Sequence, residues 1–159
     1  MKEMEPSAKG SNSINILIIG NNPVELSSIY ENLRKFEGVK FITEFAFNLS
    51  DAKDKAAKSK PSYILVDDNL RKKDIRAFTK SMRDDQKTRD IPIALLKSSN
   101  YGAWLTSGFQ DFLMKKNFSA DKLYKSILNL FRWRKTQLYL LKTYRKSQKK
   151  VVDLSKKLV

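Results

Sequence analysis

The chain has 159 residues, of which 41% are hydrophobic, and it carries a formal net charge of +15 at pH 7. It contains no cysteine and no histidine, which excludes disulfides, thiolate or imidazole metal sites, Ser-His triads and histidine phosphodonors. No apolar stretch approaches the roughly 20 residues that span a bilayer. We therefore expect a cytoplasmic protein with no membrane partner, built as one domain with an extension.

The first part of the chain alternates apolar strands with helices. Residues 1–12 are polar and predict a disordered lead-in. Ile14–Ile19 is a short β-branched run that predicts a buried strand. The pair Asn22-Pro23 predicts the start of a helix, because Asn is a strong N-cap and Pro favours the first helical position. A strand over 39–47 and a helix over 50–59 are expected next.

The second part continues the same alternation. Its apolar runs are bounded by polar and turn-forming residues, as expected for strands linked by helices. In chain order we predict a strand over 62–67, a helix capped by Asp74, a strand over 91–96, a short helix within 98–109, a strand over 111–114, and a last helix that Ser119 opens.

Strands that alternate with helices predict right-handed crossovers and a parallel sheet. The expected fold is α/β, a flavodoxin-like doubly wound five-stranded parallel sheet (order 2-1-3-4-5) over residues 13–131. Helices cover both of its faces, and the last helix is extended. In such sheets the ligand crevice lies at the carboxyl ends of the strands, beside the first strand.

Polar residues follow several of these predicted strands. Asp67, Lys97 and Lys115 each end an apolar run, whereas the first strand ends in Gly20 and Asn21 without an acid. If the strand tips are neighbours, the crevice holds one buried acid and two amines. No nucleophile–base pair is evident among these residues, so we do not expect an enzyme.

Three segments carry a resemblance to a known family. They are PSYILVDDNL (61–70), DDQKTRDIPIALL (84–96) and GFQDFLMKK (108–116). Their order and spacing resemble the receiver domain of bacterial response regulators (CheY-like), a module of two-component signal transduction and phosphorelay. The resemblance places Asp67 at the phosphoacceptor position and Lys115 at that of the invariant lysine. It also places Asn69 where a backbone carbonyl helps to hold the metal, Phe112 at the switch aromatic, and Ser98 in the crevice.

Two departures from that family concern phosphorylation. Gly20 and Asn21 stand where an acidic pair would hold Mg²⁺, and Lys97 stands where a Thr or Ser would hold a phosphoryl oxygen. We therefore expect a degenerate pseudo-receiver without a metal or cofactor, in which Lys97 and Lys115 pair with Asp67. Two alternatives stay open. In the first, Lys97 points to solvent and Asp67 pairs with Lys115 only. In the second, Asp67 is still slowly phosphorylated with weakly held Mg²⁺, using Asn21 and Asp68 as poor ligands.

Residues 132–159 form a basic extension with ten Lys or Arg and one acid. The residues favour a helix, and rough 3–4 spacing of apolar positions suggests a homodimer through this helix. The predicted function is thus a regulatory protein-interaction module whose partner is a sensor kinase or a downstream output module. The alternative is a nucleic-acid or acidic-partner binder that uses the basic extension.

Overall fold

A computed structural model describes residues 13–98 and 109–157 of the chain. Within these residues five parallel strands form one sheet in the order β2-β1-β3-β4-β5. This confirms the predicted fold class and strand order. The strands are β1 (Ser13–Ile19), β2 (Lys40–Ala46), β3 (Tyr63–Asp67), β4 (Ile93–Lys97) and β5 (Asp111–Met114).

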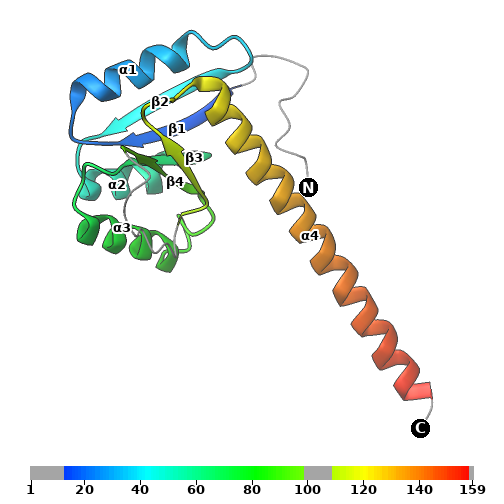
Figure 1. Cartoon of the computed structure of the whole chain (residues 1–159). Coiled ribbons are helices and arrows are strands. Elements are labelled where there is room, and N and C mark those ends of the chain that lie inside the picture. The colour runs from blue at the N-terminus through cyan, green and yellow to red at the C-terminus, as the bar shows by residue number, and fades with distance from the viewer. Residues whose placement is uncertain (1–12, 99–108, 158–159) are drawn as a thin grey trace. The chain divides into compact units, whose positions relative to one another are not determined.

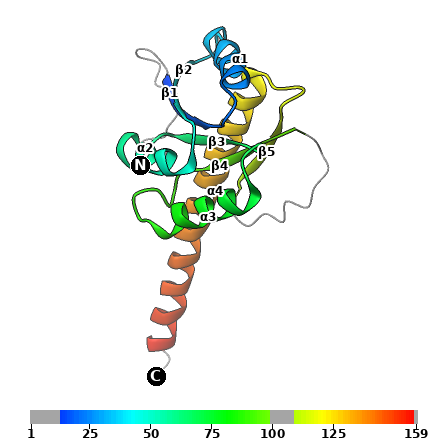
Figure 2. The same cartoon turned by 90° about the vertical axis from the view of Figure 1, so that its left-hand side faces the viewer.

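Helices cover both faces of this sheet. Figures 1 and 2 show α1 (Pro23–Arg34) on one face and α2 (Leu49–Ser59) with α3 (Lys72–Asp84) on the other. The start of α1 follows the prediction, because the Asn22 side chain accepts hydrogen bonds from the backbone N–H groups of Val24 and Glu25 at 3.1 and 3.4 Å. This cap fixes the first turn of α1 beside the end of β1.

The core holds the strand tips in place. Every residue of β3 is buried, and each fully buried Leu, Ile or Val contributes about 1.5–3 kcal/mol to folding. Helix α1 buries Leu26, Ile29 and Leu33, while the sheet face under α2 and α3 forms one apolar cluster. That cluster contains Leu17, Ile19, Ala46, Ala52, Ala56, Ile64, Val66, Ile75, Phe78, Met82, Ile93 and Leu95.

The strand register brings the carboxyl ends of β1, β3, β4 and β5 together. Ile19 pairs with Val66, Asp67 pairs with Leu96, and Lys97 pairs with Met114. The backbone N–H of Lys115 then donates to the carbonyl of Lys97 at 2.8 Å. The residues that follow each strand therefore meet at one edge of the sheet, where the crevice was predicted.

One predicted helix boundary is wrong. Helix α3 begins at Lys72 rather than after Asp74, and its N-cap Arg71 makes no side-chain capping bond. Asp74 lies inside the first turn, where a carboxylate favours the positive helix end, and it pairs with Arg71 at 3.1 Å. The predicted lead-in over 1–12 and most of the helix predicted within 98–109 lie outside the described residues.

The chain divides into two compact units, residues 1–126 and 127–159. The division falls within α4 (Ala120–Lys157), shortly before the boundary predicted after residue 131. In the first unit, Tyr124 of α4 packs against Phe36, with ring centroids 5.5 Å apart. Among the described residues, no helix combines the length and apolar character that a membrane crossing requires.

Candidate functional site: an acid held by a lysine at the strand tips

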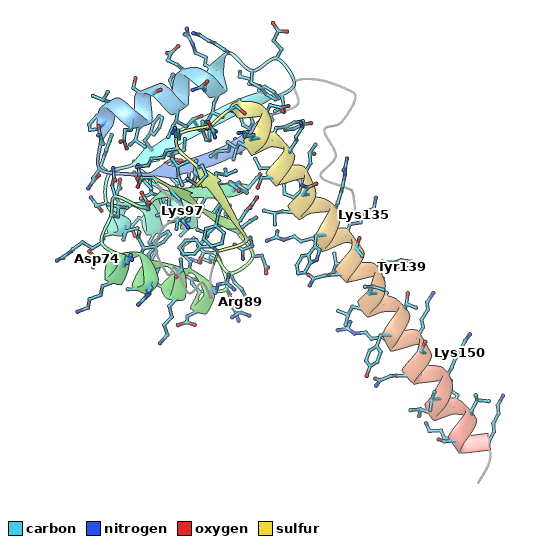
Figure 3. All side chains as sticks on the ribbon, viewed as in Figure 1. Asp74, Arg89, Lys97, Lys135, Tyr139 and Lys150 are labelled. Atoms are coloured by element: carbon cyan, nitrogen blue, oxygen red, sulfur yellow. The ribbon has the colours of Figure 1, made fainter. Side chains whose placement is uncertain are left out.

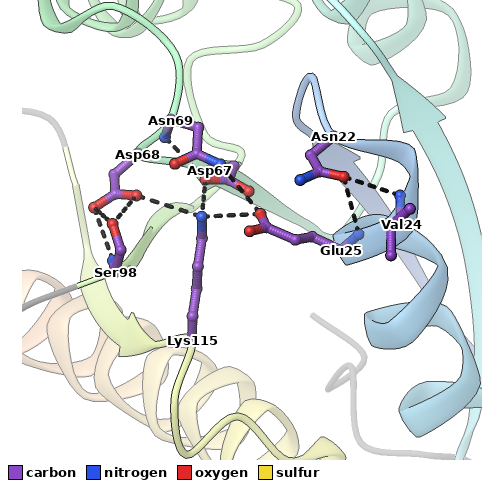
Figure 4. A network of polar contacts seen from close by, with 8 residues as sticks. All are labelled: Asn22, Val24, Glu25, Asp67, Asp68, Asn69, Ser98 and Lys115. Atoms are coloured by element: carbon purple, nitrogen blue, oxygen red, sulfur yellow. Dashed lines mark hydrogen bonds and ion pairs between the residues drawn. The ribbon is translucent and has the colours of Figure 1, made fainter.

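Asp67 is the buried acid of the crevice. Its side chain is 1% exposed, and its Oδ1 accepts hydrogen bonds from the backbone N–H of Asn69 at 2.9 Å and from Lys115 Nζ (Figure 4). Its Oδ2 is also buried and has no hydrogen-bond partner among the described residues. One oxygen of this carboxylate is therefore fully engaged, and the other is shielded from solvent.

Lys115 is the central cation of the site. Its Nζ lies 2.5 Å from Asp67 Oδ1, 3.1 Å from Glu25 Oε2 and 3.6 Å from Asp68 Oδ1. The strand register explains this position. Asp67 pairs with Leu96 and Leu96 with Leu113, and side chains on a strand alternate between faces. Lys115, two residues beyond Leu113, therefore starts from the same face as Asp67, so its ammonium reaches the acid.

The predicted pairing of Lys97 with Asp67 is wrong. Within the described part of the chain, Asp67 forms an ion pair with Lys115 alone, and Lys97 Nζ instead lies 5.5 Å from the centroid of the Phe112 ring. The alternation of side chains between the two faces of the sheet puts Lys115 on the same face as Asp67 but puts Lys97 on the other face. Lys97 follows Leu96, the register partner of Asp67, and so starts from the opposite face. Phe112 pairs with Leu95 on that face, which places an aromatic ring under the ammonium.

Glu25 is a member of the site that the sequence analysis missed. Its Oε2 accepts from Lys115 Nζ and from the side-chain amide of Asn69, both at 3.1 Å. The Asn22 cap holds the backbone of Glu25 in the first turn of α1. The sequence did contain a signal, since Asn22 followed by an acid three residues later resembles a capping box at the tip of β1.

The other predicted crevice residues have separate roles. Ser98 donates from its backbone N–H and its hydroxyl to Asp68, at 2.8 and 2.8 Å, which ties the end of β4 to the end of β3. Gly20 is buried beside Asp67, Asn21 is exposed, and Phe112 is 40% exposed. The side chain of Asp68 is only 11% exposed, and its Oδ1 lies 3.6 Å from Lys115 Nζ.

The two central groups both hold protons more firmly than usual. Burial raises the pKa of the Asp67 carboxyl above its ordinary value, while the hydrogen bonds from Lys115 and Asn69 oppose that rise and the nearby Glu25 charge adds to it. Burial acts to lower the pKa of Lys115, but its hydrogen bonds to Asp67 and Glu25 outweigh burial and raise it. At neutral pH Lys115 is therefore a fixed cation.

The acidic side chains of the crevice are the candidate ligands for a divalent metal. Within the described residues no cluster of three or more acidic side chains has the arrangement that would hold a metal ion. A Cβ atom at Gly20 would lie 3.2 Å from Asp67 Cβ and 3.0 Å from Leu26 Cδ2, so any side chain at this strand tip requires its neighbours to move by a few tenths of an ångström. The lysine ammonium takes the central place among the carboxylates.

Comparison with known proteins gives a clear structural likeness. Neither protein-family models nor curated protein sequences match this chain. Among solved structures, it is similar to a response regulator from Desulfuromonas acetoxidans, with 24% identity over 76% of this chain and 98% of that one and a TM-score of 0.60. It is also similar to the receiver domain of a sensor histidine kinase from Pseudomonas aeruginosa PAO1, solved with magnesium coordinated in its active-site cleft. That match has 23% identity over 75% and 98% of the two chains, with a TM-score of 0.64. A putative response regulator from Chloroflexus aurantiacus has 21% identity over 76% and 99%, with a TM-score of 0.64. The chain therefore has the fold of response-regulator receiver domains.

Proposed function

We propose that this chain is a receiver-like regulatory module whose crevice is held in one charge state by Lys115, without Mg²⁺-dependent phosphorylation of Asp67. The module acts by contact with proteins of two-component signalling, a sensor kinase or a downstream output module. Its role is regulatory rather than catalytic. The observation that carries the proposal is a crevice in which Gly20 and Asn21 supply no acid and one ammonium lies within 3.6 Å of the carboxylates present.

The chemistry of phosphoryl transfer supports this proposal. The reaction depends on positioning and on neutralisation of the charge on the transferred group, which a metal ion commonly provides. The similar Pseudomonas aeruginosa domain coordinates magnesium in its cleft. Here Gly20 and Asn21 supply no carboxylate, and Oε2 of the nearby Glu25 is engaged by Lys115 and Asn69. A carboxylate nucleophile must also be reachable. Asp67 is 1% exposed, and its Oδ1 is engaged by Lys115 and Asn69.

The position of Lys97 agrees with a fixed crevice. Its ammonium lies near the Phe112 ring rather than at the acid, and a cation over an aromatic face contributes about 0.5–1 kcal/mol at an exposed site. This contact links the ends of β4 and β5 on the face opposite to Asp67. The aromatic position that the resemblance associates with switching therefore has Lys97 as a neighbour.

The test is incubation of the full chain with acetyl phosphate and Mg²⁺, followed by intact mass measurement. We expect no phosphoryl adduct, and calorimetry should detect no Mg²⁺ binding at millimolar concentration. An adduct that disappears in Asp67→Asn, and persists in the neighbouring control Asp68→Asn, would refute the proposal and restore a conventional phosphorylatable receiver. Binding of candidate protein partners is then compared between the unmodified chain and the variants Lys97→Thr and Lys115→Met, which alter the crevice at two different points.

A further inference from the structure

The second unit of the chain carries a regular surface pattern on α4. If Gln137, Tyr144 and Val151 are given heptad position a, then position d holds Trp133, Leu140, Ser147 and Leu154. We call these seven residues the seam. None of them is charged, and the apolar members are 59–64% exposed in the single chain. A 3–4 spacing kept over three heptads is the pattern of a coiled coil.

The lysines follow the same period on the other side of the helix. Position f lies opposite the seam. It holds a lysine in each of four successive heptads, namely Lys135, Lys142, Lys149 and Lys156. An exact seven-residue period in both the uncharged seam and the charged back is what distinguishes a coiled-coil helix from an ordinary surface helix. Figure 3 labels Lys135, Tyr139 and Lys150 along α4, none of which belongs to the seam.

The placement of charge identifies what covers the seam. Seven of the ten bases between residues 132 and 157 stand at b, c or f and so point away from a helix packed on the seam. They are Arg132, Lys135, Lys142, Arg145, Lys146, Lys149 and Lys156. An acidic partner helix would be recognised through bases at e and g, which flank the seam. Here those flanking positions are mostly uncharged, so the seam fits another uncharged seam.

We propose that the seam pairs with the seam of a second copy of this chain as a parallel, in-register coiled coil. In that arrangement each g residue faces the e residue five positions further along the other helix. The pairs are Thr136 with Leu141, Thr143 with Gln148, and Lys150 with Ser155. No base faces another base across the seam, even though the unit as a whole is strongly basic.

The polar residue Gln137 at an a position favours the parallel register. In it Gln137 faces Gln137 of the second copy, and two amides can hydrogen-bond to each other. The antiparallel register that aligns Gln137 with Leu154 would leave the amide without a partner, which is costly in a buried position, and the cysteine crosslink described below distinguishes the parallel arrangement from the other antiparallel registers. Tyr144 can be covered in either case, because its hydroxyl accepts a hydrogen bond from Gln148 Nε2 of the same helix at 2.7 Å.

The test is sedimentation equilibrium on the full chain, with two variants that introduce the same residue two positions apart. We expect a dimer at micromolar concentration. Leu140→Glu, on the seam, should weaken the dimer by at least about 100-fold, whereas Leu138→Glu, at position b, should leave it intact. Circular dichroism of each variant checks that the domain is folded.

Orientation is tested with single cysteines, because the natural chain has none. Gln137→Cys should form a disulfide between copies under mild oxidation, and the matched control Lys142→Cys at position f should not. A monomeric chain, equal effects of Leu138→Glu and Leu140→Glu, or no crosslink through Cys at 137 would each overturn the proposal. So would a monomer that binds vesicles containing phosphatidylserine. None of these outcomes bears on phosphorylation at Asp67, so the two proposals fail separately.

Discussion

Replacement of Lys115 by Met tests whether the ammonium balances the crevice. The substitution keeps an unbranched side chain but removes the only ion-pair partner of Asp67 within the described residues. Two unit charges 2.5 Å apart attract by about 7 kcal/mol at an effective dielectric of about 20, and desolvation of the ions cancels much of this. Removal of one partner from a buried pair typically costs about 3–5 kcal/mol. Since Lys115 is 17% exposed, we expect about 3 kcal/mol.

The loss should depend on pH in a defined direction. In Lys115→Met the pKa of Asp67 rises further above its usual value of 3.8, because the favourable interactions with the ammonium are gone. When the pKa of Asp67 is higher in the folded than in the unfolded chain, the free energy of unfolding is highest below pH 3.8. It then falls as the pH rises through the folded-state pKa. The variant should therefore be most destabilised at neutral pH and approach the wild type as the pH falls toward 4.

The assay is urea denaturation followed by circular dichroism, at about pH 4.5 and about pH 8. In a separate thermal denaturation, a chain of this size should lose about 6–12 °C in Tm for a loss of about 3 kcal/mol. Lys116→Met is the matched control, because Lys116 is the next residue and is exposed. It should change stability by less than about 0.5 kcal/mol. Asp67→Asn combined with Lys115→Met should recover much of the loss. An equal loss at both pH values would show that packing, rather than charge, is the cause.

Three other predictions concern the same domain. The pKa of Lys115 is raised by its partners, so the stability they provide is complete below 10.5 and is lost as pH rises through the raised value. Wild type should therefore lose more stability than Lys115→Met between about pH 9 and pH 12, as urea denaturation can show. Gly20→Asp with Asn21→Asp should be less stable without metal, because a Cβ at residue 20 meets Leu26 at 3.0 Å. It should gain stability with added Mg²⁺, seen as a rise in Tm with Mg²⁺ concentration, and no rise would show that the strand-tip acids are not the missing ligands. Tyr63→Phe should cost about 1 kcal/mol in urea denaturation, because the Tyr63 hydroxyl bonds to Ser126 Oγ at 3.0 Å in a buried position. The control Tyr139→Phe, at a residue 69% exposed, should have no measurable effect.

The fold was predictable because its signals are local. Short apolar runs separated by helical segments define a parallel sheet, and the tips of a parallel sheet meet at one edge. Asp67 and Lys115 could therefore be placed together from sequence. The N-cap at Asn22 was equally visible, since the capping side chain and the N–H groups it accepts from lie within three residues.

The parts of the site that were predicted wrongly or missed depend on less local geometry. Whether Lys97 reaches Asp67 depends on a single step of register, because one residue along a strand exchanges the two faces. The ion pair of Glu25 with Lys115 joins residues 90 positions apart in the chain. It requires the first turn of α1 to lie over the end of β5. No sequence pattern within a single helix or strand predicts that α1 and the end of β5 lie together.

The strong positive charge of the chain does not argue against self-association through α4. The bases at position f recur every seven residues, which is about 10.5 Å along a helix, and they lie on the side opposite the seam. Pairing of two seams would leave both lysine rows exposed and would double the charge that one assembly presents. A nucleic acid or an acidic protein, the alternative partner predicted from sequence, would contact those rows and leave the seam covered. The two kinds of partner therefore use different residues of one helix, and they respond to different perturbations. A glutamate at residue 140 interrupts the seam but leaves the lysine rows in place, whereas added salt screens the rows and has little effect on an uncharged seam.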